Sequence, residues 1–290
     1  MTTKQWLKKH APKLTGKTVA ITGATGGLGG ALTEHLAALG ADLILLDRNQ
    51  KKSEALQNKL YSTHPDCKIT RIAVDMEDFD SVRAACDSLL TQVPDFLILN
   101  AGAYHIPRHK TSIGFDNVFQ INGIAPYYMA KRLHDAIAAK HGKIVAVGSI
   151  AHNYSKSDPD DIDFSARKKP SLVYGNAKRY LTYSFFEAFA DSDAAAIAHP
   201  GITFTNITAH YPKIIFAIIK HPMKIIFPST KKASLSILFA LFADTPSRTW
   251  TGPRLFGIWG IPKTRTLKTA SRAESAAIAE RMEKIYRDLD

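Results

Sequence analysis

The chain has 290 residues, of which 45% are hydrophobic and 22% are charged, so it can bury a sizeable core and is too apolar to be intrinsically disordered. We find no run of about 20 apolar residues and no secretory signal, so we expect no membrane-spanning helix and a cytoplasmic location. The net charge of +12 comes from the two ends: residues 1–20 contribute +5, residues 21–210 contribute −1 and residues 211–290 contribute +8.

Taken in chain order, the elements alternate between short apolar strands and helical stretches. The predicted strands cover residues 17–24, 41–47, 68–75, 94–102, 141–149 and 194–201. The predicted helices cover residues 27–40, 50–62, a stretch between residues 75 and 94, residues 113–140 and the segment around Tyr174.

This alternation predicts an α/β fold of one domain over residues 1–290. Strands at this interval indicate a Rossmann-type, doubly wound parallel sheet with helices on both faces. Polar residues at the carboxyl ends of such strands would form the site. Residues 202–262 fit the alternation least well, and we assign them to a substrate-binding or lid region.

A glycine-rich turn, TGATGGLGG at residues 22–30, joins the first strand to the first helix. Glycine there permits positive φ and lets backbone amides approach a pyrophosphate at the positive end of the helix. Tight strand-to-helix connections also use glycine, so the strand before the turn and the helix after it carry the argument. This context predicts a dinucleotide site that includes Gly23, Gly27, Leu28 and Gly29.

The second strand ends at Asp47, 18 residues beyond Gly29. A carboxylate at this place can bond the ribose hydroxyls of an adenosine, and the alternative is a solvated loop acid. Arg48 follows directly, and a basic residue here could instead accept a 2′-phosphate. The carboxylate is the shorter side chain and stands at the strand end, so between NAD and NADP we favour NAD.

Tyr174 precedes Lys178 by four residues in a helical segment, which places both side chains on one helix face. Standing alone, they would be an ordinary surface pair. A free phenol has a pKa of about 10, and a fixed positive charge close by lowers that pKa toward neutrality. The pair therefore has the chemistry of a proton donor and acceptor, provided that other site residues accompany it.

Taken together, these residues resemble the short-chain dehydrogenase/reductase family. TGATGGLG is similar to the family's TGxxxGxG turn, and equally to the TGxxGxxG turn of longer, epimerase-like relatives. The NAG element after the fourth predicted strand and the length of the chain favour the shorter branch. The residues that match family elements outside the turn are Asp75, Asn100, Ala101, Gly102, Asn122, Ser149, Tyr174, Lys178, Pro200, Gly201 and Thr205.

The resemblance implies a role for each of these residues. Tyr174 would exchange a proton with the substrate oxygen while hydride passes to or from a nicotinamide, and Ser149 would hydrogen-bond that oxygen. Lys178 would hold the cofactor ribose and tune Tyr174. Asn122 would keep a water in a proton path. The remaining matched residues would bind the cofactor.

Ser149 and Tyr174 lie 25 residues apart in the sequence, about twice the usual family interval. The inserted residues and the HPG triplet at 199–201 resemble the retinol-dehydrogenase-like branch, which implies an apolar substrate. We expect His199 to fix the turn that follows it, and His152 to be a loop residue.

Residues 211–228 combine Ile and Phe runs with Lys213, Lys220 and Lys224. The family places its mobile substrate lid here, which is the interpretation that we favour. A buried core helix and an amphipathic segment that contacts a membrane are the alternatives.

The sequence therefore predicts an NAD(P)-dependent oxidoreductase that interconverts an alcohol and a carbonyl on an apolar small molecule. We expect no metal, because two cysteines and 11 histidines show no ligand spacing, and no nucleic acid, because no known binding module accompanies the basic ends. Weak peripheral membrane contact and a homo-oligomer stay open. The alternatives are a redox-sensing regulatory protein without turnover, which needs only the glycine turn, and an epimerase-like enzyme.

Overall fold

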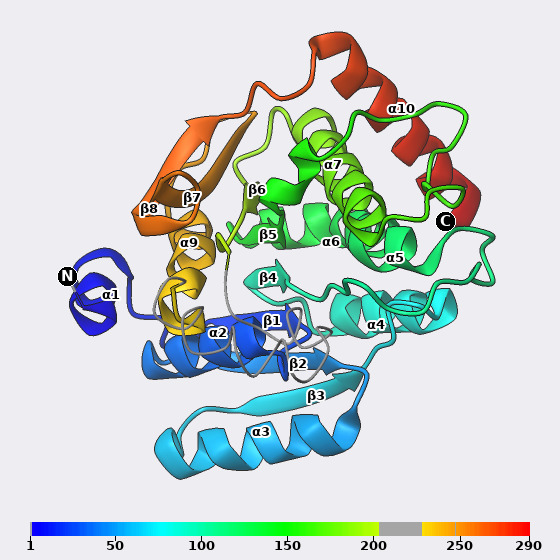
Figure 1. Cartoon of the computed structure of the whole chain (residues 1–290). Helices are drawn as coiled ribbons and strands as arrows, with labels where there is room; N and C mark the ends of the chain where they lie inside the picture. The colour runs from blue at the N-terminus through cyan, green and yellow to red at the C-terminus, as the bar shows by residue number, and fades with distance from the viewer. Residues whose placement is uncertain (1, 203–227, 247) are drawn as a thin grey trace, which may run out of the picture.

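The computed structural model describes residues 2–202, 228–246 and 248–290. Its strands form one sheet in the order β3-β2-β1-β4-β5-β6-β7-β8 (Figure 1). Neighbours from β3 to β7 pair in parallel, and β8 pairs antiparallel with β7. The predicted α/β fold with a mostly parallel sheet is confirmed. The strands are β1 (Thr18–Thr22), β2 (Asp42–Asp47), β3 (Ile69–Ala73), β4 (Phe96–Leu99), β5 (Lys143–Val147), β6 (Ala195–Ala198), β7 (Thr249–Leu255) and β8 (Trp259–Thr266).

Helices cover both faces of the sheet. Successive residues of a strand point to opposite faces, and both sets are apolar, so each face needs a covering layer. Val19 and Ile21 of β1 pack with α1, α2 and α9, whereas Ala20 packs on the other face with α4, α6, α7 and α10. The helical elements are α1 (Thr3–His10), α2 (Gly27–Ala38), α3 (Gln50–Thr63), α4 (Phe79–Thr91), α5 (Asn117–Phe119), the π-helix η1 (Gln120–Ile124), α6 (Ala125–Ala139), the 3₁₀ helix η2 (Ile150–Asn153), α7 (Pro170–Ala188), α9 (Thr230–Phe242) and α10 (Arg272–Leu289). Within the described residues, no helix is both long and apolar enough to span a membrane.

The sequence predicts one helix over residues 113–140, whereas the structure begins it directly after Asp116 and divides it. The Asp116 carboxylate caps the start by accepting two N–H groups of the first turn. The π-helical segment Gln120–Ile124 then precedes α6. Pro126 explains the change of helix type, because it has no N–H and cannot give the carbonyl of Asn122 an α-helical bond.

Residues 228–262, within the predicted substrate-binding region, hold more regular structure than the sequence indicates. α9 packs against α2, and β7 extends the parallel sheet beyond β6. Gly252 and Pro253 interrupt the apolar pattern of β7, so a search for apolar runs misses this strand. These residues build the sheet and one of its covering layers. The predicted lid at 211–228 lies outside the described residues, except for Pro228.

One buried ion pair ties α10 to α7. Arg179 is 2% exposed, and its guanidinium donates to both carboxylate oxygens of Glu274 at 2.8 and 2.7 Å. The same guanidinium donates to the carbonyls of His152 and Thr269 at 3.0 and 2.8 Å. These contacts bring three distant segments together around the residue that follows Lys178.

We expect Glu274→Ala to lower the free energy of unfolding by about 3 kcal/mol, because the Arg179 charge would stay buried without its partner. Urea unfolding followed by circular dichroism measures this change. Glu280→Ala is the matched control, since Glu280 is an exposed acid on the same helix and its loss should cost less than about 0.5 kcal/mol. Equal losses for both variants would contradict the structural importance of the ion pair.

Candidate active site

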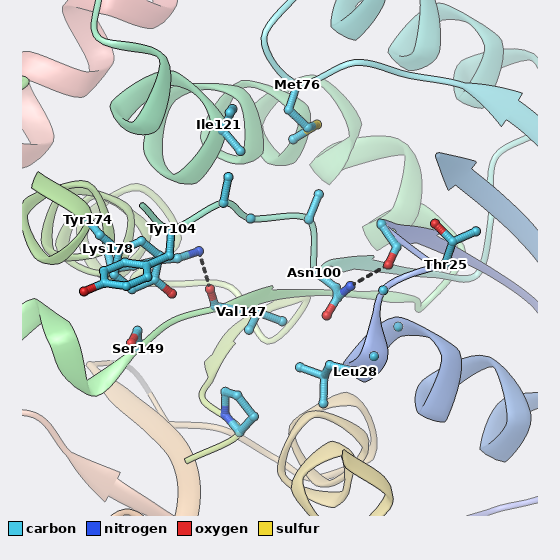
Figure 2. Close-up of a pocket in the computed structure, with 18 of the residues that line it drawn as sticks. Thr25, Leu28, Met76, Asn100, Tyr104, Ile121, Val147, Ser149, Tyr174 and Lys178 are labelled. Carbon is cyan, nitrogen blue, oxygen red and sulfur yellow. Dashed lines mark hydrogen bonds between the residues drawn. The ribbon is translucent and has the colours of Figure 1, made fainter. Parts of the chain in front are cut away.

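The predicted site residues gather around one cavity of about 580 Å³ at the carboxyl ends of the parallel strands (Figure 2). The turns after β1, β2, β4, β5 and β6 line it, together with the first part of α7. Asn122 lies behind the cavity wall, and Thr205 lies outside the described residues. The predicted residues that do line the cavity are Gly23, Gly27, Leu28, Gly29, Asp47, Arg48, Asp75, Asn100, Ala101, Gly102, Ser149, Tyr174, Lys178, Pro200 and Gly201.

The glycine turn is held by close backbone contacts. Gly23 has a φ of +66° and donates its N–H to the carbonyl of Leu46 at 2.8 Å. A Cβ on Gly29 would lie 2.2 Å from the carbonyl oxygen of Gly23, so this position requires glycine. α2 begins at Gly27, and its N-cap Gly26 makes no side-chain bond to the first N–H groups. These N–H groups are therefore available to bind an anion.

The Asp47 carboxylate fastens the glycine turn to the end of β2. Asp47 is 2% exposed, and its Oδ1 accepts from the backbone N and the hydroxyl of Thr25, both at 2.9 Å. Its Oδ2 accepts from the Ser53 hydroxyl at 3.2 Å. The neighbouring Arg48 side chain is 68% exposed and lies 3.6 Å from a carboxylate oxygen of Asp75. Asp47 thus positions the turn, in addition to its predicted ribose contact.

The NAG element ties the end of β4 to the end of β1. The side-chain amide of Asn100 donates to the carbonyls of Thr22 and Gly23 at 3.0 and 3.1 Å (Figure 2). The N–H of Ala101 donates to the Thr22 hydroxyl at 2.9 Å. Asn100 therefore sets the distance between the glycine turn and the centre of the sheet.

Asn122 is fully buried and holds the chain that follows the NAG element. Its amide nitrogen donates to the carbonyls of Ala103 and Val118 at 2.8 Å each, and its Oδ1 accepts from the Ala103 N–H at 3.2 Å. A Cβ on Gly102 would lie 2.8 Å from that Oδ1 and 3.8 Å from Lys178 Nζ, which requires glycine here too. The side chain of Asn122 thus has a structural task, and its predicted part in a proton path stays a prediction.

Ser149 and Tyr174 meet at one end of the cavity. Ser149 ends the turn after β5, where its Oγ accepts from the Ala151 N–H at 3.2 Å, and it lines the cavity together with Tyr174. Burial raises the pKa of Tyr174 to about 12, while the Ser149 hydroxyl acts in the opposite direction. The neighbouring phenols of Tyr154 and Tyr104 add to the rise.

Lys178 lies one turn of α7 beyond Tyr174. Its Nζ donates to the carbonyl of Val147 at 2.9 Å and lies 5.9 Å from the centre of the Tyr174 ring. Burial lowers the pKa of Lys178 to about 7. The expectation that Lys178 lowers the pKa of Tyr174 stays a prediction, and burial is the main influence on that pKa in the structure.

The Pro200-Gly201 turn lies beside Trp250 of β7. The N–H of Gly201 donates to Nδ1 of His199 at 3.2 Å, and Gly201 has a φ of +81°. The His199 ring stacks on Trp250 with 4.0 Å between ring centroids. The prediction that His199 fixes this turn is confirmed.

His152 is not the loop residue that the sequence indicates. It is buried in η2, and burial lowers its pKa to about 4. Its Nδ1 contacts the carbonyl oxygen of Ser149 at 2.7 Å, and its Nε2 contacts the Thr269 hydroxyl at 2.9 Å. Because a carbonyl only accepts, Nδ1 carries the hydrogen and Nε2 accepts from Thr269. The residue thus connects the segment before α10 to Ser149, a link that no sequence pattern revealed.

Two further tyrosines line the cavity, and no sequence pattern identified them as site residues. Tyr104 packs edge-on against Tyr174, with ring centroids 5.3 Å apart and an interplanar angle of 80°. Tyr154 comes from the insertion between Ser149 and Tyr174, is exposed, and lines the same cavity. Their places, directly after the NAG element and within the insertion, are the signals that could have identified them.

Comparison with known proteins assigns the family. The family described as short chain dehydrogenase matches residues 17–158. Mouse retinol dehydrogenase 14 is 30% identical over 212 residues, which are 67% of this chain and 64% of the mouse protein. The chain belongs to the short-chain dehydrogenase family. Human polyprenol dehydrogenase, another relative, is 24% identical over 88% of this chain and 78% of its own length.

Solved structures show the same fold for this short-chain dehydrogenase. The crystal structure of an uncharacterized protein from Mycobacterium Paratuberculosis superimposes with a TM-score of 0.73 at 25% identity, and covers 94% of this chain and 95% of that one. The NADPH-dependent 3-quinuclidinone reductase from Rhodotorula Rubra gives a TM-score of 0.61 at 20% identity, over 80% of this chain and 86% of that one. The eight-stranded sheet is therefore the fold of this family.

Lys178→Met should change the pH dependence of stability. The folded-state pKa of Lys178 lies at about 7, below the ordinary 10.5, so in wild type the stability rises with pH between these values. Methionine removes this dependence. The melting temperature of the variant, relative to wild type, should therefore be highest at pH 7 and should fall as the pH approaches about 10.

Thermal unfolding of both proteins over this pH range measures the difference. Lys232→Met, at an exposed lysine on α9, controls for the loss of one positive charge. A Lys178→Met difference that does not vary with pH would contradict the burial-lowered pKa.

Proposed function

We propose that the chain is an NAD(P)-dependent oxidoreductase that interconverts an alcohol and a carbonyl on an apolar small molecule, with Tyr174 as the acid and base. The observation that carries the proposal is that Ser149, Tyr174 and Lys178 line the same cavity as the glycine turn. In an ordinary surface pair Lys178 would not be buried, and Tyr174 would not line a cavity with a dinucleotide-type turn.

The residues of the cavity fit a dinucleotide. α2 presents N–H groups that no side chain of its N-cap binds, which suits a pyrophosphate. Because Gly29 has no Cβ, the start of α2 can pack directly against the Gly23 carbonyl, as the tight turn of a dinucleotide site requires. Asp47 and Asp75 lie at the ends of β2 and β3, where adenosine would bind, and Lys178 and Gly201 lie toward the opposite end, with Ser149.

A bound nicotinamide would supply or accept the hydride. Ser149 would donate a hydrogen bond to the substrate oxygen, which stabilises the charge that develops there. Tyr174 would give its phenolic proton to that oxygen during reduction, and take a proton from the alcohol during oxidation. The phenol of Tyr174 is protonated at neutral pH, as a proton donor in carbonyl reduction must be.

The lining of the cavity supports an apolar substrate. Ile150, Ile202, Tyr104 and Tyr154 all line it with apolar side-chain surface. Two relatives are named for retinol and polyprenol, which are both apolar alcohols. We infer that the aromatic rings beside Tyr174 contact the carbon skeleton next to the reacting oxygen.

We expect Tyr174→Phe to lower kcat by more than tenfold and to leave the cofactor Kd nearly unchanged, because only the transferable proton is removed. Stopped assays with a panel of apolar alcohols and carbonyls, read by absorbance of the reduced nicotinamide, measure kcat. Tyr154→Phe is the matched control, because Tyr154 is an exposed phenol that lines the same cavity but lies outside the predicted catalytic set. If Tyr174→Phe keeps more than a tenth of wild-type kcat, a loss below about 1.4 kcal/mol, Tyr174 is not the acid.

We propose NAD as the preferred cofactor, on the position of Asp47. Its buried carboxylate lies at the cavity wall and would repel a 2′-phosphate. Arg48 would attract that phosphate, but its guanidinium lies beside the carboxylates of Asp75 and Glu77, at 3.6 and 3.8 Å.

Asp47→Ala should raise the ratio of kcat/KM with NADP to kcat/KM with NAD by about tenfold. This is the scale of one lost charge-assisted bond and one relieved repulsion. Asp47→Asn is the matched variant, because it keeps an acceptor for Thr25 while it removes the charge. The ratio should shift in both variants, whereas the affinity for either cofactor should fall further in Asp47→Ala. A wild type that already prefers NADP tenfold would show that Arg48 decides.

A further inference from the structure

The hairpin of β7 and β8 forms one edge of the sheet (Figure 1). It exposes large apolar side chains. Phe256, at the tip, is 86% exposed, and Leu255 and Ile261 are 54% and 48% exposed. Trp259 is 36% exposed on the same hairpin. Exposed apolar residues that scatter singly need no explanation, but four within seven residues form a patch that marks an interaction site.

The tip residue is also held in an unfavourable backbone conformation. Phe256 has a φ of 51°, in the left-handed region where Asn and Gly are the common residues. Gly257, with a φ of 68°, completes the turn. An exposed aromatic side chain in a costly conformation stabilises neither the core nor the turn. Such a residue indicates a function outside the folded chain itself.

The hairpin lies in the most one-sidedly basic stretch of the chain. Residues 245–273 hold six Lys and Arg and no Asp or Glu. Of these, Arg254, Lys263 and Arg265 are exposed on the hairpin. No ion pair is found for these three within the described residues. Trp259, Ile261, Lys263 and Arg265 alternate along β8 and therefore share one face.

The N-terminal helix adds positive charge on the same side. α1 and β8 both contact α9, as Figure 1 shows at the left of the molecule. Trp6 anchors α1 on α9 through Phe239, with ring centroids 6.3 Å apart. Lys4, Lys8 and Lys9 of α1 are exposed. Both elements that pack on α9 here, α1 and β8, thus expose basic groups.

We propose that the β7–β8 hairpin docks this protein on an anionic lipid membrane, with Phe256 inserted among the lipids and the basic side chains at the headgroups. Aromatic and aliphatic tips surrounded by Lys and Arg have the chemistry of interfacial membrane binding. A second copy across a two-fold axis would place this basic surface against itself, which is unfavourable. A nucleic acid would match the charge but would leave Leu255 and Ile261 unburied.

Docking would bring the cavity to the membrane surface. A Cβ on Gly201, which lines the cavity, would lie 3.1 Å from the carbonyl oxygens of Gly257 and Ile258 in the hairpin. An apolar alcohol dissolved in lipid would therefore meet the site without crossing bulk water. This delivery rests on the proposed function, whereas docking itself does not.

Vesicle co-sedimentation of the full chain tests docking. Wild type should bind vesicles of phosphatidylserine and phosphatidylcholine, and binding should weaken as salt is raised. Phe256→Asn should bind roughly tenfold more weakly, the scale of one lost buried apolar side chain. Its melting temperature should stay equal or rise, because Asn accepts the left-handed conformation. Lys263→Gln should weaken binding roughly fivefold.

Two control variants keep the result specific. Leu90→Asn removes an exposed apolar residue on α4, away from the hairpin, and should bind vesicles as wild type does. Tyr174→Phe should also bind as wild type does, which separates docking from the proposed catalysis. Undiminished binding by Phe256→Asn, or equal loss in Leu90→Asn, would overturn the proposal. So would a concentration-dependent dimer that Phe256→Asn abolishes, because the patch would then face a second copy.

Discussion

Parallel pairing of the strands is the constraint on which the site depends. Five neighbouring strands, β2, β1, β4, β5 and β6, run in one direction, so their carboxyl ends meet at one edge of the sheet. Groups as far apart in sequence as Gly23 and Gly201 therefore lie in one cavity. The apolar residues on both faces fix this arrangement, because a strand with two buried faces cannot shift its register without exposing one of them. The edge is thus rigid enough to hold a cofactor and a substrate at a fixed distance.

At that edge, the backbone depends on residues that lack a Cβ or an N–H group. Gly29 and Gly102 lie where a Cβ would collide with a carbonyl oxygen or an amide oxygen. Pro126 lacks the N–H that would continue an α-helix, and a π-helix follows around Asn122. Polar side chains then fix these turns through hydrogen bonds, as Asp47 does when it accepts from the N–H and the hydroxyl of Thr25. These three irregularities of the backbone coincide with places where a ligand or a site residue needs room.

The sequence predicts the sheet up to β6 and the membership of the cavity, because apolar strands and a glycine turn have strong local patterns. It misses β7, whose Gly252 and Pro253 break the pattern, and it cannot reveal contacts across the fold such as the one between His152 and Thr269. It also does not show the burial that raises the pKa of Tyr174. Burial is a property of the packed structure, and no spacing along the chain measures it.

The ion pair between Arg179 and Glu274 has a consequence for synthesis on the ribosome. Arg179 follows Lys178 directly, and its acidic partner is translated 95 residues later. Until α10 emerges, the guanidinium lacks its carboxylate, and the start of α7 is held less firmly than in the finished protein. The central strands can pair as they leave the exit tunnel, but Tyr174 and Lys178 on α7 are set in place last. Nascent chains of this protein would thus form the glycine turn before the position of α7 is fixed.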